Sequence, residues 1–436
     1  MSLFRAELDA LTQIEPLGIT GRVASVRGLS LLATELPVPI GSLVEIGAEH
    51  GSSIITGEVV GFEGPHTIIM LLADTTGIVP GAPIRLRQVF QAAPVSRRML
   101  GRVVNGLGQP IDDLGPISES VNRPINPAPI GPMNRKRIEQ QLLTGVRAID
   151  LMTPMGRGQR LGIFAGPGVG KSTLLGQIAR ATDADVNVIA LIGERGREVL
   201  DFIHHSLGEE GLARSVVIVA TSDESPLLRI RAAKLATTAA EFFRDRGDDV
   251  LLMMDSVTRF AMAQREIGLA LGEPPTTKGY TPSVFTLLPK LMERAGTSAT
   301  RGSITGLYTV LVEGDDTNEP IADAIRSILD GHIVLTRELA MQGHYPAIDV
   351  PRSISRVMDD IVSEDHRICA RKLKSILATY RRAEDLINIG AYAAGSNPDI
   401  DHAIQMIAGI NAYLRQDVDT TVSLEESVAA LTALFD

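Results

Sequence analysis

The fold of this chain is decided by one stretch, Phe164-Ala165-Gly166-Pro167-Gly168-Val169-Gly170-Lys171-Ser172-Thr173. A short apolar segment precedes it, and apolar residues at helical spacing follow it. Glycines let backbone N–H groups turn inward and approach a polyphosphate closely, and a helix N-terminus adds further donors and a favourable dipole. The stretch therefore predicts a phosphate-binding loop between a strand and a helix.

Two side chains at the end of this loop have separate predicted roles. We expect Lys171 to reach the β- and γ-phosphates of a nucleotide and the Ser172 hydroxyl to bind Mg²⁺. The usual pattern begins with glycine where this chain has Ala165, and a small residue still allows the turn. The alternative is an ordinary glycine-rich loop before a helix, which the complete Gly-Lys-Ser ending disfavours.

The region around this loop alternates helical patterns with short, nearly continuous apolar segments. These predict strands at residues 161–164, 186–192, 215–220, 250–254, 307–312 and 332–335. Fully apolar strands alternating with helices indicate a parallel sheet covered on both faces, an α/β fold.

The two ends of the chain have different patterns. Residues 18–91 contain short apolar segments split by glycine turns, which predicts a small β-barrel or sandwich, or alternatively one β layer of a larger domain. Residues 92–140 are rich in loops, and beyond Asp359 the apolar residues recur only at helical spacing. We therefore expect a barrel domain at 1–92, a nucleotide-binding domain at 93–360 and a helical domain at 361–436.

Composition limits the classes of function. The 436 residues carry a net charge of −10, which argues against general binding of nucleic acid but leaves a local basic channel open. No apolar run reaches the ~20 residues that span a bilayer, and the N-terminus does not resemble a secretory signal. A single cysteine, Cys369, rules out an intramolecular disulfide, and the eight histidines lack the spacing of a transition-metal site.

Acidic residues follow two of the predicted strands. Asp255 ends the strand at 250–254, where the carboxylate would lie beside the phosphate loop and orient Mg²⁺. Glu194 comes just after the strand at 186–192 and is the better candidate for the base that polarises water, with Glu198 as a supporting contact. A charged loop of salt bridges is an equally weighted interpretation of the segment that contains Glu194 and Glu198.

An arginine is commonly needed to stabilise the charge that develops on the γ-phosphoryl group, and a neighbouring molecule sometimes supplies it. Arg356 lies far along the chain from the phosphate loop, in Ser353-Ile-Ser-Arg356. It is a candidate for reaching across a subunit interface, although a structural ion pair is the default interpretation.

Three segments resemble the catalytic subunits of the rotary-type ATPases. They are Pro346-Ala-Ile-Asp-Val-Pro-Arg-Ser353-Ile-Ser355, Gly101-Arg-Val-Val-Asn-Gly-Leu-Gly-Gln-Pro-Ile-Asp112 and Gly193-Glu-Arg-Gly-Arg-Glu198. Within that superfamily the chain is most similar to the ATPases of flagellar and virulence type III protein export. The segments that carry this closer likeness are residues 279–290, 312–320, 330–336 and 390–395.

The resemblance implies a fold and a set of site residues. The fold is an N-terminal β-barrel, a RecA-like core with a phosphate loop and a C-terminal helical domain. The implied nucleotide-binding residues are Gly166, Pro167, Gly168, Val169, Gly170, Lys171, Ser172, Thr173 and Tyr345, with Tyr345 packing on adenine. The implied catalytic residues are Glu194 as the carboxylate that activates water, Lys171, Arg195 beside the site and Arg356 as an arginine finger. Ser172 and Asp255 are the implied Mg²⁺ residues.

The resemblance also implies the biological setting. It points to ATP and Mg²⁺ as cofactors, and to a cytoplasmic homohexamer that associates peripherally with the inner-membrane export apparatus. Its implied partners are export-gate components, chaperones, secreted substrates and a stalk-like regulatory protein, without nucleic acid. Leu3, Phe4, Leu8 and Leu11 indicate an amphipathic helix that could bind the stalk-like protein.

Three alternatives remain at this point. The chain could be a catalytic subunit of an ATP synthase, which the segment at 279–290 disfavours. It could be a non-catalytic subunit that only holds nucleotide, although Lys171 and Glu194 are both present. It could also be a hexameric RNA translocase, against which the acidic balance argues.

Overall fold

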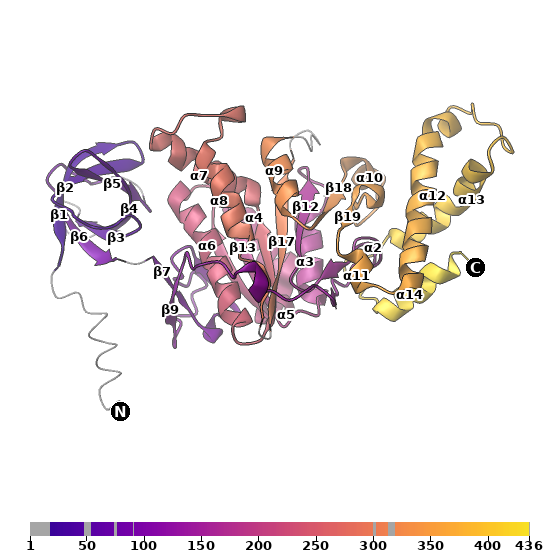
Figure 1. Ribbon diagram of the computed structural model, residues 1–436, viewed down its shortest axis with the longest axis horizontal. Coiled ribbons are helices and arrows are strands. Elements are labelled where there is room, and N and C mark those ends of the chain that lie inside the picture. The colour runs from indigo at the N-terminus through magenta and orange to yellow at the C-terminus, as the bar shows by residue number, and fades with distance from the viewer. Residues whose placement is uncertain are drawn as a thin grey trace.

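The computed structural model describes residues 18–47, 54–73, 76–89, 91–299, 302–312 and 319–435. A barrel lies at one end of an elongated molecule, a sheet with helices on its faces occupies the middle, and a group of helices forms the other end (Figure 1). Leu3, Phe4, Leu8 and Leu11 fall outside the described residues, as does most of the segment at 312–320.

The N-terminal strands close into a barrel in the order β1-β2-β5-β4-β3-β6. The strands are β1 (Thr20–Arg27), β2 (Ser30–Thr34), β3 (Leu43–Gly47), β4 (Ile54–Glu63), β5 (His66–Leu71) and β6 (Pro83–Gln88). Inward residues such as Val23, Val44 and Ile69 are buried and pack together in a separate small core. The predicted small β-barrel is therefore present, rather than one layer of a larger domain.

The central sheet has the order β19-β18-β12-β17-β15-β13-β14-β8, and β16 pairs with β17 outside this path. Its strands are β8 (Arg102–Asn105), β12 (Arg160–Ala165), β13 (Val186–Ile192), β14 (Ser215–Ala220), β15 (Asp249–Asp255), β16 (Gly296–Thr297), β17 (Ser303–Leu311), β18 (Gly331–Leu335) and β19 (Ile354–Ser355). Neighbouring strands run parallel along the path from β18 through β12, β17, β15, β13 and β14 to β8. β16 pairs antiparallel with β17, and β19 pairs antiparallel with β18. The predicted parallel sheet is confirmed, with every predicted strand in it.

Helices cover both faces of this sheet, so its strands are buried on both sides. On one face, α6 (Pro226–Arg244), α7 (Val257–Ala270), α8 (Pro282–Met292) and α9 (Pro320–Ile328) share a core with alternate strand residues such as Val188. On the other face, α2 (Arg147–Met152) and α3 (Lys171–Ala181) share a second core with the intervening residues, such as Ile189. The smaller helices of this region are α4 (Gly196–Asp201), α5 (Gly208–Ala213), α10 (Arg337–Met341) and α11 (Met358–Ile361).

The loop-rich segment before the core contributes more to the sheet than its sequence suggests. β8 forms its edge and pairs in parallel with β14, and β7 (Ala92–Val95) forms a separate two-stranded sheet with β9 (Val121–Pro124). β8 has only four residues between two glycines, and its partner lies far along the chain, so no local periodicity signals it. A short hairpin, β10 (Gln141–Leu142) with β11 (Met155–Gly156), frames α2.

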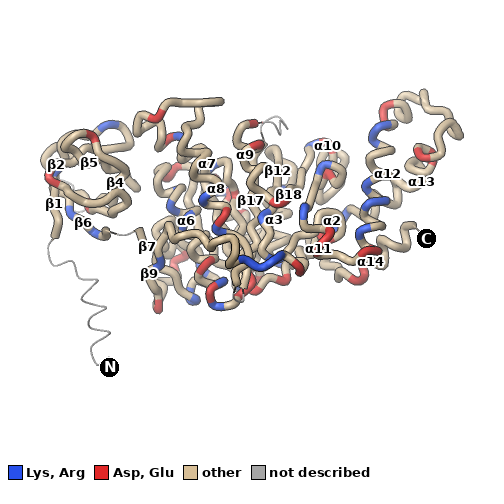
Figure 2. The backbone as a smooth tube through the Cα atoms, viewed as in Figure 1, with Lys and Arg blue, Asp and Glu red and all other residues tan. Residues whose placement is uncertain are grey.

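The C-terminal end is helical, as predicted. It consists of α12 (Glu364–Asn388), α13 (Pro398–Leu414) and α14 (Leu424–Ala433), with Asn397 capping the N-terminus of α13. Buried residues of these helices, including Leu373 and Ile410, join the core that contains α3. Lys and Arg residues recur along α12 (Figure 2). Within the described residues, no helix combines the length and apolarity needed to cross a membrane.

Candidate active site

The phosphate loop follows β12 directly and ends where α3 begins. Gly168 and Gly170 have φ of +77° and +87°, a left-handed conformation that glycine adopts without a Cβ penalty. Lys171 is the first residue of α3 and Ser172 the second, so the free N–H groups of the helix N-terminus border the loop. This is the strand–loop–helix arrangement that the sequence predicts.

Lys171 lies between two carboxylates. Its Nζ is 2.5 Å from Oδ1 of Asp255 and 3.6 Å from Oε1 of Glu194. Asp255 ends β15, and Glu194 follows β13, the neighbouring strand in the sheet. The carboxyl ends of these strands share one edge, which is where open α/β sheets bind ligands. Asp255 also accepts a hydrogen bond at 2.7 Å from the Thr309 hydroxyl on β17, a contact that no sequence pattern indicated.

Electrostatics distinguish the two carboxyl groups around Lys171. Burial raises the pKa of Glu194 to about 7; the Lys171 ammonium opposes this shift and the Asp255 carboxylate adds to it. Burial disfavours the charged form of Lys171, but the Asp255 and Glu194 carboxylates outweigh that effect and raise its pKa. The buried Glu194 Oε1 receives no hydrogen bond from the described residues. Glu194 thus has a lone pair available for a water molecule and a pKa near neutrality.

Arg195 and Glu198 lie outward from this cluster. Arg195 is 79% exposed and pairs with Glu198 at 3.4 Å. The pKa of Glu198 is lowered, first by its hydrogen bond with Glu194. Arg195 therefore lies at the margin of this cluster and pairs with Glu198.

The oxygen atoms near the loop suit Mg²⁺. This ion prefers oxygen ligands in octahedral geometry and usually keeps several waters, taking one or two protein side chains together with substrate phosphates. The Ser172 hydroxyl is exposed beside the loop, and the Asp255 carboxylate lies next to Lys171. Among the described residues no three His, Cys, Asp or Glu side chains gather into a metal cluster. The donor set fits an ion that shares its coordination with a nucleotide.

A cavity of about 430 Å³ adjoins the loop on the side of Tyr345. The Tyr345 ring is 46% exposed, and its Cε1 atom would lie 3.5 Å from a Cβ at Gly170. Thr173, Gln177 and the C-terminal residues 416–418 also line this cavity. The exposed ring offers a flat apolar surface beside the phosphate loop, as a nucleobase requires.

Gln416 holds this cavity together, and no sequence pattern indicates its role. Its side chain donates to the Gly145 and Thr420 carbonyls at 2.7 and 2.8 Å and accepts from the Arg147 N–H at 2.8 Å. Its own N–H donates to the Tyr345 carbonyl at 3.0 Å. Apart from Thr420, these partners are distant in the chain, so only the folded structure reveals them.

Arg356 lies away from the site of its own chain. It follows β19, which runs antiparallel to β18, and its N–H donates to the Asp330 carbonyl at 3.0 Å. The phosphate loop instead starts level with Leu335, at the other end of β18. At ~3.3 Å per residue the separation along the strand is about 16 Å, more than one arginine side chain spans.

Three family models match successive parts of this chain. Residues 19–86 match the ATP synthase alpha/beta family β-barrel domain, and residues 145–355 match its nucleotide-binding domain. Residues 362–433 match the C-terminal domain of the T3SS ATPase EscN.

Relatives are similar over nearly the whole chain. A flagellum-specific ATP synthase of Bacillus subtilis is 49% identical, with 98% of each chain covered. A type 3 secretion system ATPase of Pseudomonas syringae pv. tomato is 47% identical, covering 97% of this chain and 95% of the relative. The solved structure of the assembled ATPase EscN from enteropathogenic E. coli matches with a TM-score of 0.89 at 42% identity, covering 95% of this chain and 100% of that one. The chain therefore belongs to the family of flagellum-specific ATP synthases and type 3 secretion system ATPases, and it is an ATPase of the alpha/beta type.

Proposed function

We propose that this ATPase energises type III protein export, of the flagellar or the virulence type. Hydrolysis would be coupled to releasing chaperones and to unfolding or delivering export substrates. The observation that carries the proposal is the position of Lys171 between Asp255 and Glu194, at the end of a phosphate loop. The match of residues 362–433 to the EscN C-terminal domain favours an export ATPase over an ATP synthase subunit or an RNA translocase.

The residues of the site have distinct roles in this proposal. Residues 166–173 surround the phosphates, Lys171 exchanges its carboxylate partners for phosphate oxygens, and Tyr345 packs on the adenine. Glu194 accepts a proton from the attacking water, as its pKa of about 7 permits. Mg²⁺ held by Ser172 and Asp255 would neutralise charge on the phosphate oxygens.

Assembly into a homohexamer would complete the site. A solved structure of EscN shows that relative assembled, and another shows it in complex with its central stalk EscO. We infer a similar ring and a stalk-like partner for this chain, with Arg356 of each subunit acting as an arginine finger in the site of its neighbour and Arg195 at the margin of that site. The distance of Arg356 from its own phosphate loop supports this arrangement.

The setting follows from the proposed activity. We propose a cytoplasmic location with peripheral association at the inner-membrane export apparatus. The partners would be export-gate components, export chaperones and secreted proteins, and no nucleic acid. The named activity of the relatives supports this proposal.

Replacing Glu194 by glutamine tests the assignment of the base. The substitution keeps the shape of the side chain but removes proton acceptance, so kcat should fall about 10²- to 10⁴-fold while nucleotide binding persists. Glu198→Gln is the matched control and should retain most of the rate, and Lys171→Ala should lose nucleotide binding. Wild-type turnover by Glu194→Gln would overturn the assignment.

A further inference from the structure

Two cavities meet beside α6, outside the nucleotide site. One, of about 750 Å³, lies among residues 126–135, α6 and α8, and the other, of about 1100 Å³, lies between the barrel and the same helices. Four residues line both of them: Asn126, Lys234, Leu287 and Lys290. None of these residues contributes to the phosphate loop, the carboxylate cluster or the cavity at Tyr345.

Lys234 places a cation in the wall shared by the two cavities. Burial lowers the pKa of its ammonium; the Glu58 carboxylate opposes this shift, and the charges of Arg294 and Arg231 add to it. Among the residues that the structure describes, none accepts a hydrogen bond or forms an ion pair with the ammonium of Lys234 or of Lys290. For Lys234, which is partly buried, an ammonium without a partner is unfavourable; Lys290 is exposed.

The acids that line the two cavities have other partners. Glu273, in the larger cavity, accepts a hydrogen bond from the Ser283 N–H at 3.1 Å. Glu58 accepts a hydrogen bond from Gln91 and lies 3.7 Å from Arg231. The acid that lines the smaller cavity is Glu293, which pairs with Arg160 and lies 3.8 Å from Arg135. Among the described residues, these acids form no ion pair with either lysine.

Arg294, a further cation at the smaller cavity, is also engaged. It donates to both carboxylate oxygens of Glu241, at 2.9 and 2.8 Å. It donates as well to the Ile125 carbonyl at 2.8 Å and the Thr238 hydroxyl at 2.9 Å. The cations left over for a ligand are Lys234 and Lys290.

Apolar side chains form much of the rest of the smaller cavity. They are Pro127, Pro129, Ile130, Pro132, Leu287, Pro289 and Leu291. Burying apolar atoms of a ligand against these side chains would stabilise the complex. The volume of the cavity lies within the range of ligand pockets. The ligand that complements the cavity has a negative head for the lysines and an apolar body for the prolines.

We propose that the cavity among residues 126–135, α6 and α8 binds an organic anion with an apolar body, and that Lys234 and Lys290 hold its charged head. The chemical class is an amphiphilic carboxylate or sulfonate. Because residues 126–135 form part of the connection from the barrel to the core, an occupied cavity ties that connection to α6 and α8. The proposal does not depend on the hydrolysis of ATP or on protein export.

Titration of the full-length protein with anilinonaphthalene sulfonate, an aromatic sulfonate that fluoresces in apolar surroundings, tests this site. Saturating ADP and Mg²⁺ keep the probe out of the nucleotide cavity. We expect saturable binding of one probe per chain and displacement by decanoate. Lys234→Met should weaken binding about tenfold or more, as expected for loss of a charge-assisted contact, whereas Lys234→Arg should stay close to the wild type.

Two further variants make the result decisive. Lys290→Met alters an exposed residue and should also weaken binding, and Leu287→Trp should block the cavity while both charges remain. Lys136→Met, an exposed lysine outside both cavities, is the control and should bind the probe normally. Equal affinity of the wild type, Lys234→Met and Lys290→Met would overturn the proposal. So would unchanged binding by Leu287→Trp in protein with an unaltered circular dichroism spectrum.

Discussion

At the scale of single residues, the site depends on three charges that share a small volume. Lys171 has two carboxylate partners at 2.5 and 3.6 Å, and all three side chains are at most 15% exposed. Burial raises the pKa of Glu194 to about 7, and the nearby Asp255 carboxylate adds to this shift although the Lys171 ammonium opposes it. A pKa near neutrality suits the proposed role of Glu194 as the base.

The pKa of Glu194 predicts how activity depends on pH. Glu194 must be ionised to accept a proton, so kcat/KM should fall as the pH drops through about 7. Glu198→Gln should move this fall to lower pH, because the hydrogen bond and the charge of Glu198 both raise the pKa of Glu194. Steady-state rates between pH 5 and 9, measured on both proteins with buffers of constant ionic strength, check this. The same acid limb in the residual activity of Glu194→Gln would assign it to another group.

The sequence predicted those site residues that a local motif marks, and it missed those whose contacts appear only in the folded chain. The order Gly-Lys-Ser and the acids after two strands are local signals, and the structure brings Lys171, Asp255 and Glu194 together. Thr309 lies on a predicted strand, but nothing in its surroundings marks its contact with Asp255. Gln416 is still harder to find, because its partners lie more than 70 residues away apart from Thr420.

At the scale of elements, the strands follow from their apolar runs, and the differences have local causes. β17 starts at Ser303, whereas the predicted strand starts at Leu307. The prediction began too late because Thr305 and Gly306, which are both in the sheet, interrupt the apolar pattern. β8 escaped prediction because it is short and depends on β14 for its pairing. Periodicity identifies a strand that is buried along its length, whereas an edge strand of four residues carries too few positions.

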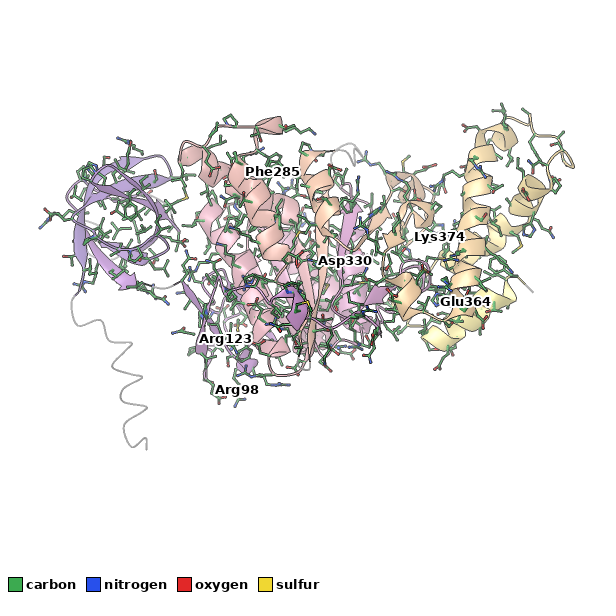
Figure 3. The ribbon with its side chains drawn as sticks, in the orientation of Figure 1. Arg98, Arg123, Phe285, Asp330, Glu364 and Lys374 are labelled. Atoms are coloured by element: carbon green, nitrogen blue, oxygen red, sulfur yellow. The ribbon has the colours of Figure 1, made fainter. Side chains whose placement is uncertain are left out.

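Helix α12 connects the C-terminal end to the segment that carries Arg356. Arg381 Nη1 lies 2.9 Å from each carboxylate oxygen of Asp349, which is 3% exposed. Lys374 lies on the part of α12 that faces the core (Figure 3), and its Nζ donates to the Ser353 carbonyl at 3.3 Å. Both contacts hold the segment that leads to Arg356.

Arg381→Ala tests this connection. It leaves the Asp349 carboxylate buried without its cation and should lower the free energy of unfolding by about 1–3 kcal/mol, a range reduced because Arg381 is partly exposed. Arg382→Ala, at the next residue of α12, is the control, since among the described residues the Arg382 side chain donates only to the Thr379 hydroxyl, at 3.3 Å. Urea denaturation followed by circular dichroism provides the comparison. Equal stabilities of the two variants would show that the Arg381–Asp349 pair does not hold α12 to the core.

At the scale of the whole molecule, the proposed mechanism leaves the site of a single chain incomplete. The phosphate loop, Lys171 and the two acids lie at the carboxyl edge of the sheet, whereas Arg356 lies beside Asp330, toward the other end of β18. An arginine that cannot reach its own nucleotide is available to a neighbouring subunit. In the proposed mechanism, assembly is therefore a condition for hydrolysis and not only for export.

Mixing two inactive variants tests this claim most directly. Glu194→Gln lacks the base but keeps Arg356, and Arg356→Ala has the opposite defect, so rings of either variant alone should hydrolyse ATP slowly. In rings formed from an equal mixture, about a quarter of the interfaces would combine an intact Glu194 with an intact Arg356 from the neighbour. We predict that the mixture recovers about a quarter of the wild-type ATPase rate, measured per subunit. A mixture no faster than the average of its two components, in rings shown by sizing to contain both variants, would contradict an Arg356 that acts across the interface.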